Sequence, residues 1–222
     1  MRKTSKSKIR LAIIATLACI AIVTVQYLVL KPSVINQIQI NRVYIGGLFT
    51  EYPTKYQPRC YIEFKEKNKY VFVYDDSRGT YEDYNEDGDG RKPHIDIYFG
   101  RYDEKEGLYK LTPIKSASVG FKNPTDARKG LIDAYGYSNL ENNKEIIGQV
   151  AAKNKKGNYV IGNPSKDGVT ISNNGLYFEI YDKSDIKKLP SSVEEFRKQF
   201  KMDKKAEQER LAEQKRLAEQ SQ

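Results

Sequence analysis

The chain has 222 residues, of which 39% are hydrophobic and 30% are charged, so we expect one domain with a modest core and terminal extensions. The formal net charge of +9 is unevenly spread: residues 1–30 carry five bases and no acid, whereas residues 31–196 carry 25 bases and 24 acids. A surface that binds nucleic acid needs clustered bases on the folded domain, so this balance predicts no nucleic-acid partner.

The first predicted element is a membrane-spanning helix that begins at Leu11 and ends at Leu30. This segment contains no charge, and a helix of about 20 residues spans the roughly 30 Å of the hydrocarbon layer. The basic residues 1–10 predict a cytoplasmic N-terminus, and Lys31-Pro32 ends the helix. We therefore predict a single-pass cell-membrane protein, with a domain over residues 33–200 outside the cytoplasm.

Two other interpretations of the N-terminal segment stay open. A cleaved signal peptide has a shorter apolar region and a cleavage site, and no good site follows this one. The stretch TLAC, which ends at Cys19, is similar to a lipoprotein cleavage box. All three interpretations place residues 33–222 outside the cytoplasm, and we predict that Cys60 is a small buried hydrophobe, with an intermolecular disulfide as the alternative.

Alternating short segments after residue 35 predict antiparallel β-structure. The expected strands cover residues 38–46, 60–65, 70–75, 79–84, 94–100, 107–112 and 116–121, with further hairpins over 145–162 and 169–181. Asn174-Gly175 suits a type I′ turn before the last strand, in which Leu176, Phe178 and Ile180 would line one face. Several short strands at this spacing predict a mainly β domain, either an antiparallel barrel or a sandwich.

One short helix is expected among these strands. Asn123 can cap it, Pro124 suits the first helical position, and Gly136 can end it. Leu131 and Ile132 would then lie within the helix and face the sheet.

The C-terminal segment predicts a docked turn of helix and then a charged helical tail over residues 201–222. Ser192 and Glu195 have the spacing of a capping box, and Phe196 and Phe200 lie one turn apart and would dock on the sheet. The tail repeats every six residues, which does not suit a coiled coil. Two interpretations of this tail stay open: a solvated helix, and a helix that folds against a partner.

The stretch DYNEDGDG, residues 83–90, is the candidate metal site. Asp83, Asn85, Asp87 and Asp89 alternate, so several oxygen atoms can point at one cation, and Asp96 is a candidate late ligand. Over about seven residues the pattern resembles the D-x-N-x-D-G core of EF-hand calcium loops, which implies calcium as the cofactor.

The same stretch departs from that family in its second half. Gly90 and His94 stand where an EF-hand has an apolar residue and Glu, and the flanking segments are expected to be strands. The alternative to a calcium loop is a solvated acidic turn, because Asp, Asn and Gly are also common turn residues.

No sequence motif points to catalysis. His94 is the single histidine and is expected to be a surface residue, and no zinc, P-loop or dinucleotide-binding pattern is present. We therefore expect a non-catalytic binding or scaffolding protein of the cell envelope, with an envelope protein or polymer as partner. The candidate contact surfaces are the mouth of the barrel and the tyrosine-rich strands at 70–74 and 177–181. The alternatives are an envelope hydrolase that uses a carboxylate pair and an accessory subunit of a membrane complex.

Overall fold

The computed structural model describes residues 32–48, 51–85, 91–141, 149–164 and 177–220. The chain divides into two units, Met1–Ser33 and Val34–Gln222, and every helix and strand given below belongs to the second. Among the residues described, no helix is both long and apolar enough to cross a membrane. The predicted anchor between Leu11 and Leu30 and the predicted turn at Asn174-Gly175 lie outside these residues.

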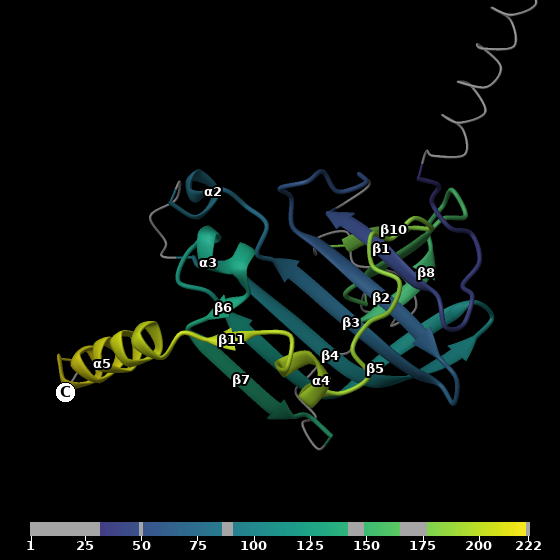
Figure 1. Ribbon diagram of the computed structural model, residues 1–222. Helices are drawn as coiled ribbons and strands as arrows, with labels where there is room; N and C mark the ends of the chain where they lie inside the picture. Colours follow the sequence, from purple (N-terminus) through teal and green to yellow (C-terminus); the bar gives the residue numbers. More distant parts are fainter. Residues whose placement is uncertain (1–31, 49–50, 86–90, 142–148, 165–176, 221–222) are drawn as a thin grey trace, which may run out of the picture. The chain divides into compact units, whose positions relative to one another are not determined.

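Eight antiparallel strands of the second unit close into a barrel (Figure 1). Their order around the ring is β4-β3-β2-β1-β10-β9-β8-β5, and β5 pairs with β4 to close it. Their bounds are β1 Val43–Leu48, β2 Arg59–Lys65, β3 Lys69–Asp76, β4 His94–Lys105, β5 Leu108–Gly120, β8 Val150–Lys153, β9 Tyr159–Gly162 and β10 Tyr177–Tyr181. The predicted mainly β class is confirmed, and the barrel is the correct alternative.

The strand β5 has different neighbours along its length. Tyr109 and Lys110 pair with β8 inside the ring, whereas residues 115–120 pair with β7 (Ala134–Asn139). The register between β4 and β5 shifts at Phe99/Gly100, between these two parts. β7 therefore extends the sheet past the ring, at one opening of the barrel.

The barrel interior holds an apolar inner cluster. β2 shows why: Cys60, Ile62 and Phe64 alternate along the strand and are fully buried among residues from the other strands of the ring. The side chains between them, such as Tyr61, point to the outer face and are also buried. Both faces of β2 are therefore covered, and even its charged residues Arg59 and Glu63 are buried.

The outer face is covered by a segment that we call the strap, residues 182–202. It crosses the outside of the sheet in front of β3, β4 and β5 (Figure 1). Leu189, Val193 and Phe196 of the strap join the outer cluster of Val71, Ile97 and similar side chains. The strap contains α4 (Val193–Arg197) and β11 (Lys201–Met202), and the C-terminal α5 (Lys204–Gln220) follows it.

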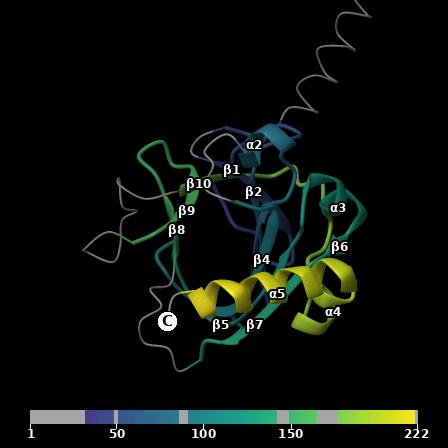
Figure 2. The same cartoon turned by 90° about the vertical axis from the view of Figure 1, so that its left-hand side faces the viewer.

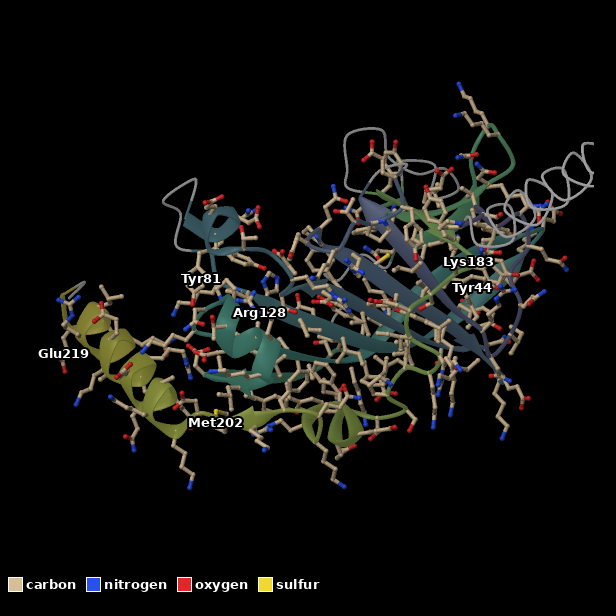
Figure 3. The ribbon with its side chains drawn as sticks, turned by 45° about the horizontal axis from the view of Figure 1, so that its top comes forward. Tyr44, Tyr81, Arg128, Lys183, Met202 and Glu219 are labelled. Atoms are coloured by element: carbon tan, nitrogen blue, oxygen red, sulfur yellow. The ribbon has the colours of Figure 1, made fainter. Side chains whose placement is uncertain are left out.

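Two short helices and one short strand lie next to the barrel: α2 (Tyr81–Asn85), α3 (Pro124–Lys129) and β6 (Leu131–Ile132), which pairs in parallel with β11. Figure 3 shows Tyr81 and Arg128 on the neighbouring helices α2 and α3. The Tyr81 hydroxyl donates to Thr125 Oγ1 at 3.0 Å, which joins the two helices. The described residues thus contain three short helices besides α5, and the prediction of one short helix is wrong.

The predicted strand at 79–84 is also wrong, because α2 begins within it at Tyr81. Asp83 accepts hydrogen bonds from the backbone N–H and the hydroxyl of Thr80, which is how an acid at the third helical position closes a first turn. Tyr84 is buried, and its hydroxyl contacts the Asp76 carbonyl at 2.8 Å. Tyr81 at the start of the same helix is exposed.

The start of α3 is as predicted and its end is not. The Asn123 side chain accepts from Asp126 N, and Pro124 takes the first position. The helix ends at Lys129 because Gly130 adopts the left-handed conformation, with φ 65°. Leu131 and Ile132, expected on the helix, therefore form β6 instead.

The C-terminal predictions are confirmed at the strap. The Ser192 hydroxyl accepts from Glu195 N, as the capping box predicts. Phe196 and Phe200 are in contact, with ring centroids 5.2 Å apart. Ala206 of α5 is buried, while Leu211 and Leu217 are about half exposed. Figure 2 shows α5 as the yellow helix on the side that faces the viewer.

The last two predicted hairpin elements are borne out in part. β8 and β9 pair in antiparallel fashion around a turn in which Asn154 N donates to the Asn158 carbonyl. In β10, Phe178 and Ile180 face the inner cluster as predicted. Tyr181 on the opposite face is buried too, so this strand is covered on both sides.

Candidate functional site

A polar pocket of about 260 Å³ lies where β7 extends the sheet. We call it the mouth pocket. It is lined by Asp96, Tyr98, Ser116, Ala117, Ser118, Gly136, Tyr137 and Ser138, from β4, β5 and β7. The described residues place one carboxylate and several hydroxyl groups around one small cavity.

Strand register brings the polar side chains of β4 and β5 in this lining to one face of the sheet, whereas Ala117 belongs to the outer cluster. Asp96 is opposite Ser118, which is opposite Gly136 on the next strand. Tyr98 and Ser116 form the equivalent pair two residues further along. Side chains alternate along a strand, so these residues share the face of Tyr98, which packs against the inner cluster. The mouth pocket therefore continues the inner face of the barrel at its opening.

The hydroxyl groups in the mouth pocket have no partner among the described residues. In the part of the chain that the structure describes, the side chains of Tyr98, Ser116, Ser118 and Ser138 make no hydrogen bond. In the described ranges, every fully buried side-chain oxygen or nitrogen has a hydrogen-bond partner, so hydroxyls without a partner are not fully buried. The free hydroxyls are therefore open to solvent, and a ligand in the cavity has donors and acceptors available.

A group of titratable residues borders the pocket on the side of β3. His94 lies between two carboxylates, with Nδ1 4.0 Å from Asp76 Oδ2 and Nε2 3.8 Å from Asp96 Oδ2. The ring of Tyr74 lies 5.9 Å from the ring of His94. Asp76 is opposite His94, and Tyr74 is opposite Asp96, so the pairing of β3 with β4 brings all four together.

Burial dominates the electrostatics of this group. It raises the pKa of Asp76 and of Asp96, and the neighbouring His94 counteracts part of that rise for both carboxyls. Burial, with the nearby Asp76, raises the pKa of the Tyr74 hydroxyl to about 12. The pKa of Tyr98 is raised by burial and by Asp96. The site therefore carries carboxylates that are poorly hydrated and tyrosines that stay neutral.

Of the predicted calcium ligands, the structure describes the side chains of Asp83 and Asp96. Asp83 belongs to α2 and is bonded to Thr80, whereas Asp96 is on β4 and lines the mouth pocket. Asn85 ends α2, and Asp87 and Asp89 lie outside the described residues. The segment before the loop is a helix and not the predicted strand. Within the described ranges, no three Asp, Glu, His or Cys side chains are grouped to hold a metal ion.

The other candidate residues have mainly structural surroundings. Cys60 is fully buried and free, as predicted, and burial strongly raises the pKa of its thiol. Tyr70 and Tyr181 are buried in the two clusters, so they are ordinary sheet residues. Tyr74 alone of these two strands belongs to the group at the pocket.

The sequence patterns did not point to Tyr98, Ser116, Ser118 or Ser138 as site residues. Alternation in SASVG was visible, but it does not tell which face of a strand is inside. Gly136 was interpreted as a helix end, whereas here it gives space: a Cβ atom at Gly136 would lie 2.7 Å from Ser118 Oγ. A signal for the site was the polar residue at every second position of β5, opposite Asp96 and Tyr98.

Comparison of the chain with protein-family models, with curated proteins and with solved structures finds no match.

Proposed function

We propose that this protein is a membrane-anchored, extracytoplasmic binding protein of the cell envelope that holds its ligand in the mouth pocket. The observation that carries the proposal is the set of unpartnered hydroxyls of Tyr98, Ser116 and Ser118 around a cavity next to an apolar barrel core. Small-molecule sites combine a concave surface with a few convergent polar groups, and the mouths of β-barrels are frequent places for them. The segment from Leu11 to Leu30 supplies the anchor.

Thiol labelling in intact cells tests both parts of the proposal. Two variants with one introduced cysteine each are made in a full-length Cys19→Ser background: Ser118→Cys in the pocket and Tyr56→Cys as the control. Tyr56 is 51% exposed and does not line the pocket, and native Cys60 is buried. A membrane-impermeant thiol reagent is applied to cells and, separately, to the purified protein.

We expect the Tyr56→Cys variant to be labelled in intact cells. We also expect Ser118→Cys to be labelled more slowly than Tyr56→Cys in cells, because a bound ligand shields the pocket. The ratio of the Ser118→Cys labelling rate to the Tyr56→Cys labelling rate should then increase after purification. Labelling of Tyr56→Cys only after lysis would overturn the extracytoplasmic location. An equal ratio in cells and in purified protein would overturn occupancy of the pocket.

A second candidate function is hydrolysis of an envelope polymer. Asp76 and Asp96 lie on the two sides of His94, and both carboxyls have a raised pKa because of burial. A hydrolase that uses two carboxyl groups needs one that keeps its proton near neutral pH. Release of soluble fragments from purified envelope by the full-length protein, abolished by Asp76→Asn, would favour this function over simple binding.

A further inference from the structure

The chemistry of the mouth pocket restricts the charge of its ligand. Among the residues that the structure describes, its lining contains the carboxylate of Asp96 and no Lys or Arg side chain. The second carboxylate, Asp76, lies on the other side of His94. Two carboxylates repel an anion, and the repulsion is strong where water is partly excluded. An anionic ligand is therefore disfavoured.

The same surroundings favour an organic cation. Asp96 Oδ2 lies 3.8 Å from His94 Nε2, and Nδ1 of the same ring lies 4.0 Å from Asp76 Oδ2, so two carboxylates share one imidazole. The hydroxyls of Tyr98, Ser116 and Ser118 have free lone pairs that can accept N–H donors. The ring of Tyr98 adds an aromatic surface, which attracts cations. A primary ammonium group has three N–H donors. The carboxylate of Asp96 and the hydroxyl oxygens around it can accept hydrogen bonds from all three.

The size of the pocket restricts how much of a ligand it can hold. Pockets for drug-sized molecules have about 300–1,000 Å³, and 260 Å³ is below this range. The cavity therefore suits the tip of a larger molecule.

We propose that the mouth pocket binds a primary ammonium group at the tip of a larger envelope molecule, with Asp96 as its counter-ion. This inference rests on the proposed binding function and adds the chemical class of the ligand. An ammonium tip has two chemical sources outside the membrane, a lysine side chain of a peptide and an amino sugar of a polysaccharide. Both present the same group to Asp96.

The test measures how well small probes protect the pocket from labelling. The purified full-length Ser118→Cys protein, in the Cys19→Ser background, reacts with a small uncharged thiol reagent. The probes are n-butylammonium and the neutral 1-butanol, which has the same number of heavy atoms, together with glucose, at matched ionic strength. The charge is removed in Asp96→Asn, and Asp103→Asn is the matched control, because Asp103 is an exposed β4 residue outside the pocket.

We expect n-butylammonium at about ten times its Kd to slow labelling about tenfold, and 1-butanol and glucose to have no effect. Asp96→Asn should raise the n-butylammonium concentration needed for the same protection at least tenfold, and Asp103→Asn should not change this concentration. Nα-acetyllysine amide and glucosamine then separate the two sources, since the true source protects at lower concentration. Protection by 1-butanol or glucose equal to that by n-butylammonium, or protection unchanged by Asp96→Asn, overturns the ammonium class.

The two proposals fail in different ways. If no probe protects Ser118→Cys while the pocket is shielded in cells, the ammonium class is wrong and the binding function stands. If the pocket is not shielded in cells, the binding function itself is wrong.

Discussion

Tyr61 on the outer face of β2 donates a hydrogen bond of 2.8 Å to Asp185 Oδ1 in the strap, 124 residues later in the chain. The same carboxylate lies 3.4 Å from Arg78 Nη1 and 3.6 Å from Arg59 Nη1. Arg59 is almost fully buried, so Asp185 compensates a charge that has little contact with water. This group joins the strap to the barrel by polar contacts, next to the apolar ones of Leu189 and Phe196.

Removal of Asp185 should loosen the strap. Asp185→Ala deletes the acceptor of Tyr61 and the ion-pair partner of two arginines, and we expect a loss of about 1–2 kcal/mol in the free energy of unfolding. Thermal unfolding of the full-length protein in detergent measures it as a decrease of about 2–8 °C in Tm. Asp103→Ala removes an exposed carboxylate and serves as the control. An Asp185→Ala variant as stable as this control would show that the apolar contacts alone hold the strap.

Phe196 is the apolar anchor of the strap. It is 2% exposed and packs against Phe200, whose ring in turn contacts Phe121. We expect Phe196→Ala to cost about 3–5 kcal/mol, because a large buried ring leaves a cavity. Denaturant unfolding gives the value. Leu211→Ala in α5 is the control and should change stability by less than about 0.5 kcal/mol, since Leu211 is 50% exposed. Similar costs for both variants would contradict the docked position of α4.

Asp96 should stabilise the fold less as a carboxylate than as a neutral group. Burial raises its pKa in the folded protein, so the folded state binds the proton more tightly than the unfolded state does. Its contribution to stability therefore increases as the pH falls through the folded pKa toward the unfolded value of about 4, and is lost as the pH rises.

Asp96→Asn should remove this dependence. We expect a Tm at pH 7 that is equal to or about 2 °C above that of the parent, and a difference that disappears near pH 4. The measurement is Tm against pH for the variant and for Asp103→Asn. A clear loss of stability of Asp96→Asn at pH 7 would mean that the charge of Asp96 stabilises the folded state and does not destabilise it.

The thiol of Cys60 should be inert in the folded protein. Its side chain is fully buried, so a reagent cannot reach the sulfur atom. Burial also raises the pKa of the thiol, so the reactive thiolate does not form. In a Cys19→Ser background we expect labelling at least about a thousandfold slower than in denaturant, because it requires unfolding. The Tyr56→Cys variant is the reactive control. A disulfide-linked dimer on a non-reducing gel would instead support the intermolecular alternative.

The two hypotheses for residues 83–90 predict different responses to calcium. A calcium loop should raise Tm by about 3–6 °C at ten times its Kd, which corresponds to about 1.4 kcal/mol, and Asp87→Asn and Asp89→Asn should abolish the shift. A solvated turn predicts no shift. Asp83→Ala should lower stability by at most about 1 kcal/mol with or without calcium, because Asp83 closes the first turn of α2. A loss seen only with calcium would make Asp83 a ligand.

The sequence by itself determined the mainly β class, the pairing of neighbouring strands, the caps at Asn123 and Ser192, and the burial of Cys60. These features depend on alternation and on turn and cap residues within a few positions, which a sequence displays directly. Where the prediction of α2 and α3 was wrong, the correct signal was also local in the sequence. Gly130 ends α3 before the more distant Gly136 does, and Thr80 and Asp83 have the spacing of a capped first helical turn.

Only the tertiary structure decided which face of each strand is inside. The strap covers the outer face, so β2 and β10 are buried on both sides and their sequences do not mark the interior. The mouth pocket depends on the register of four strands: β3 brings Asp76, β4 brings His94 and Asp96, and β5 and β7 bring the hydroxyls. A shift of one residue would turn each of these side chains to the other face, and pairing across distant segments fixes that register.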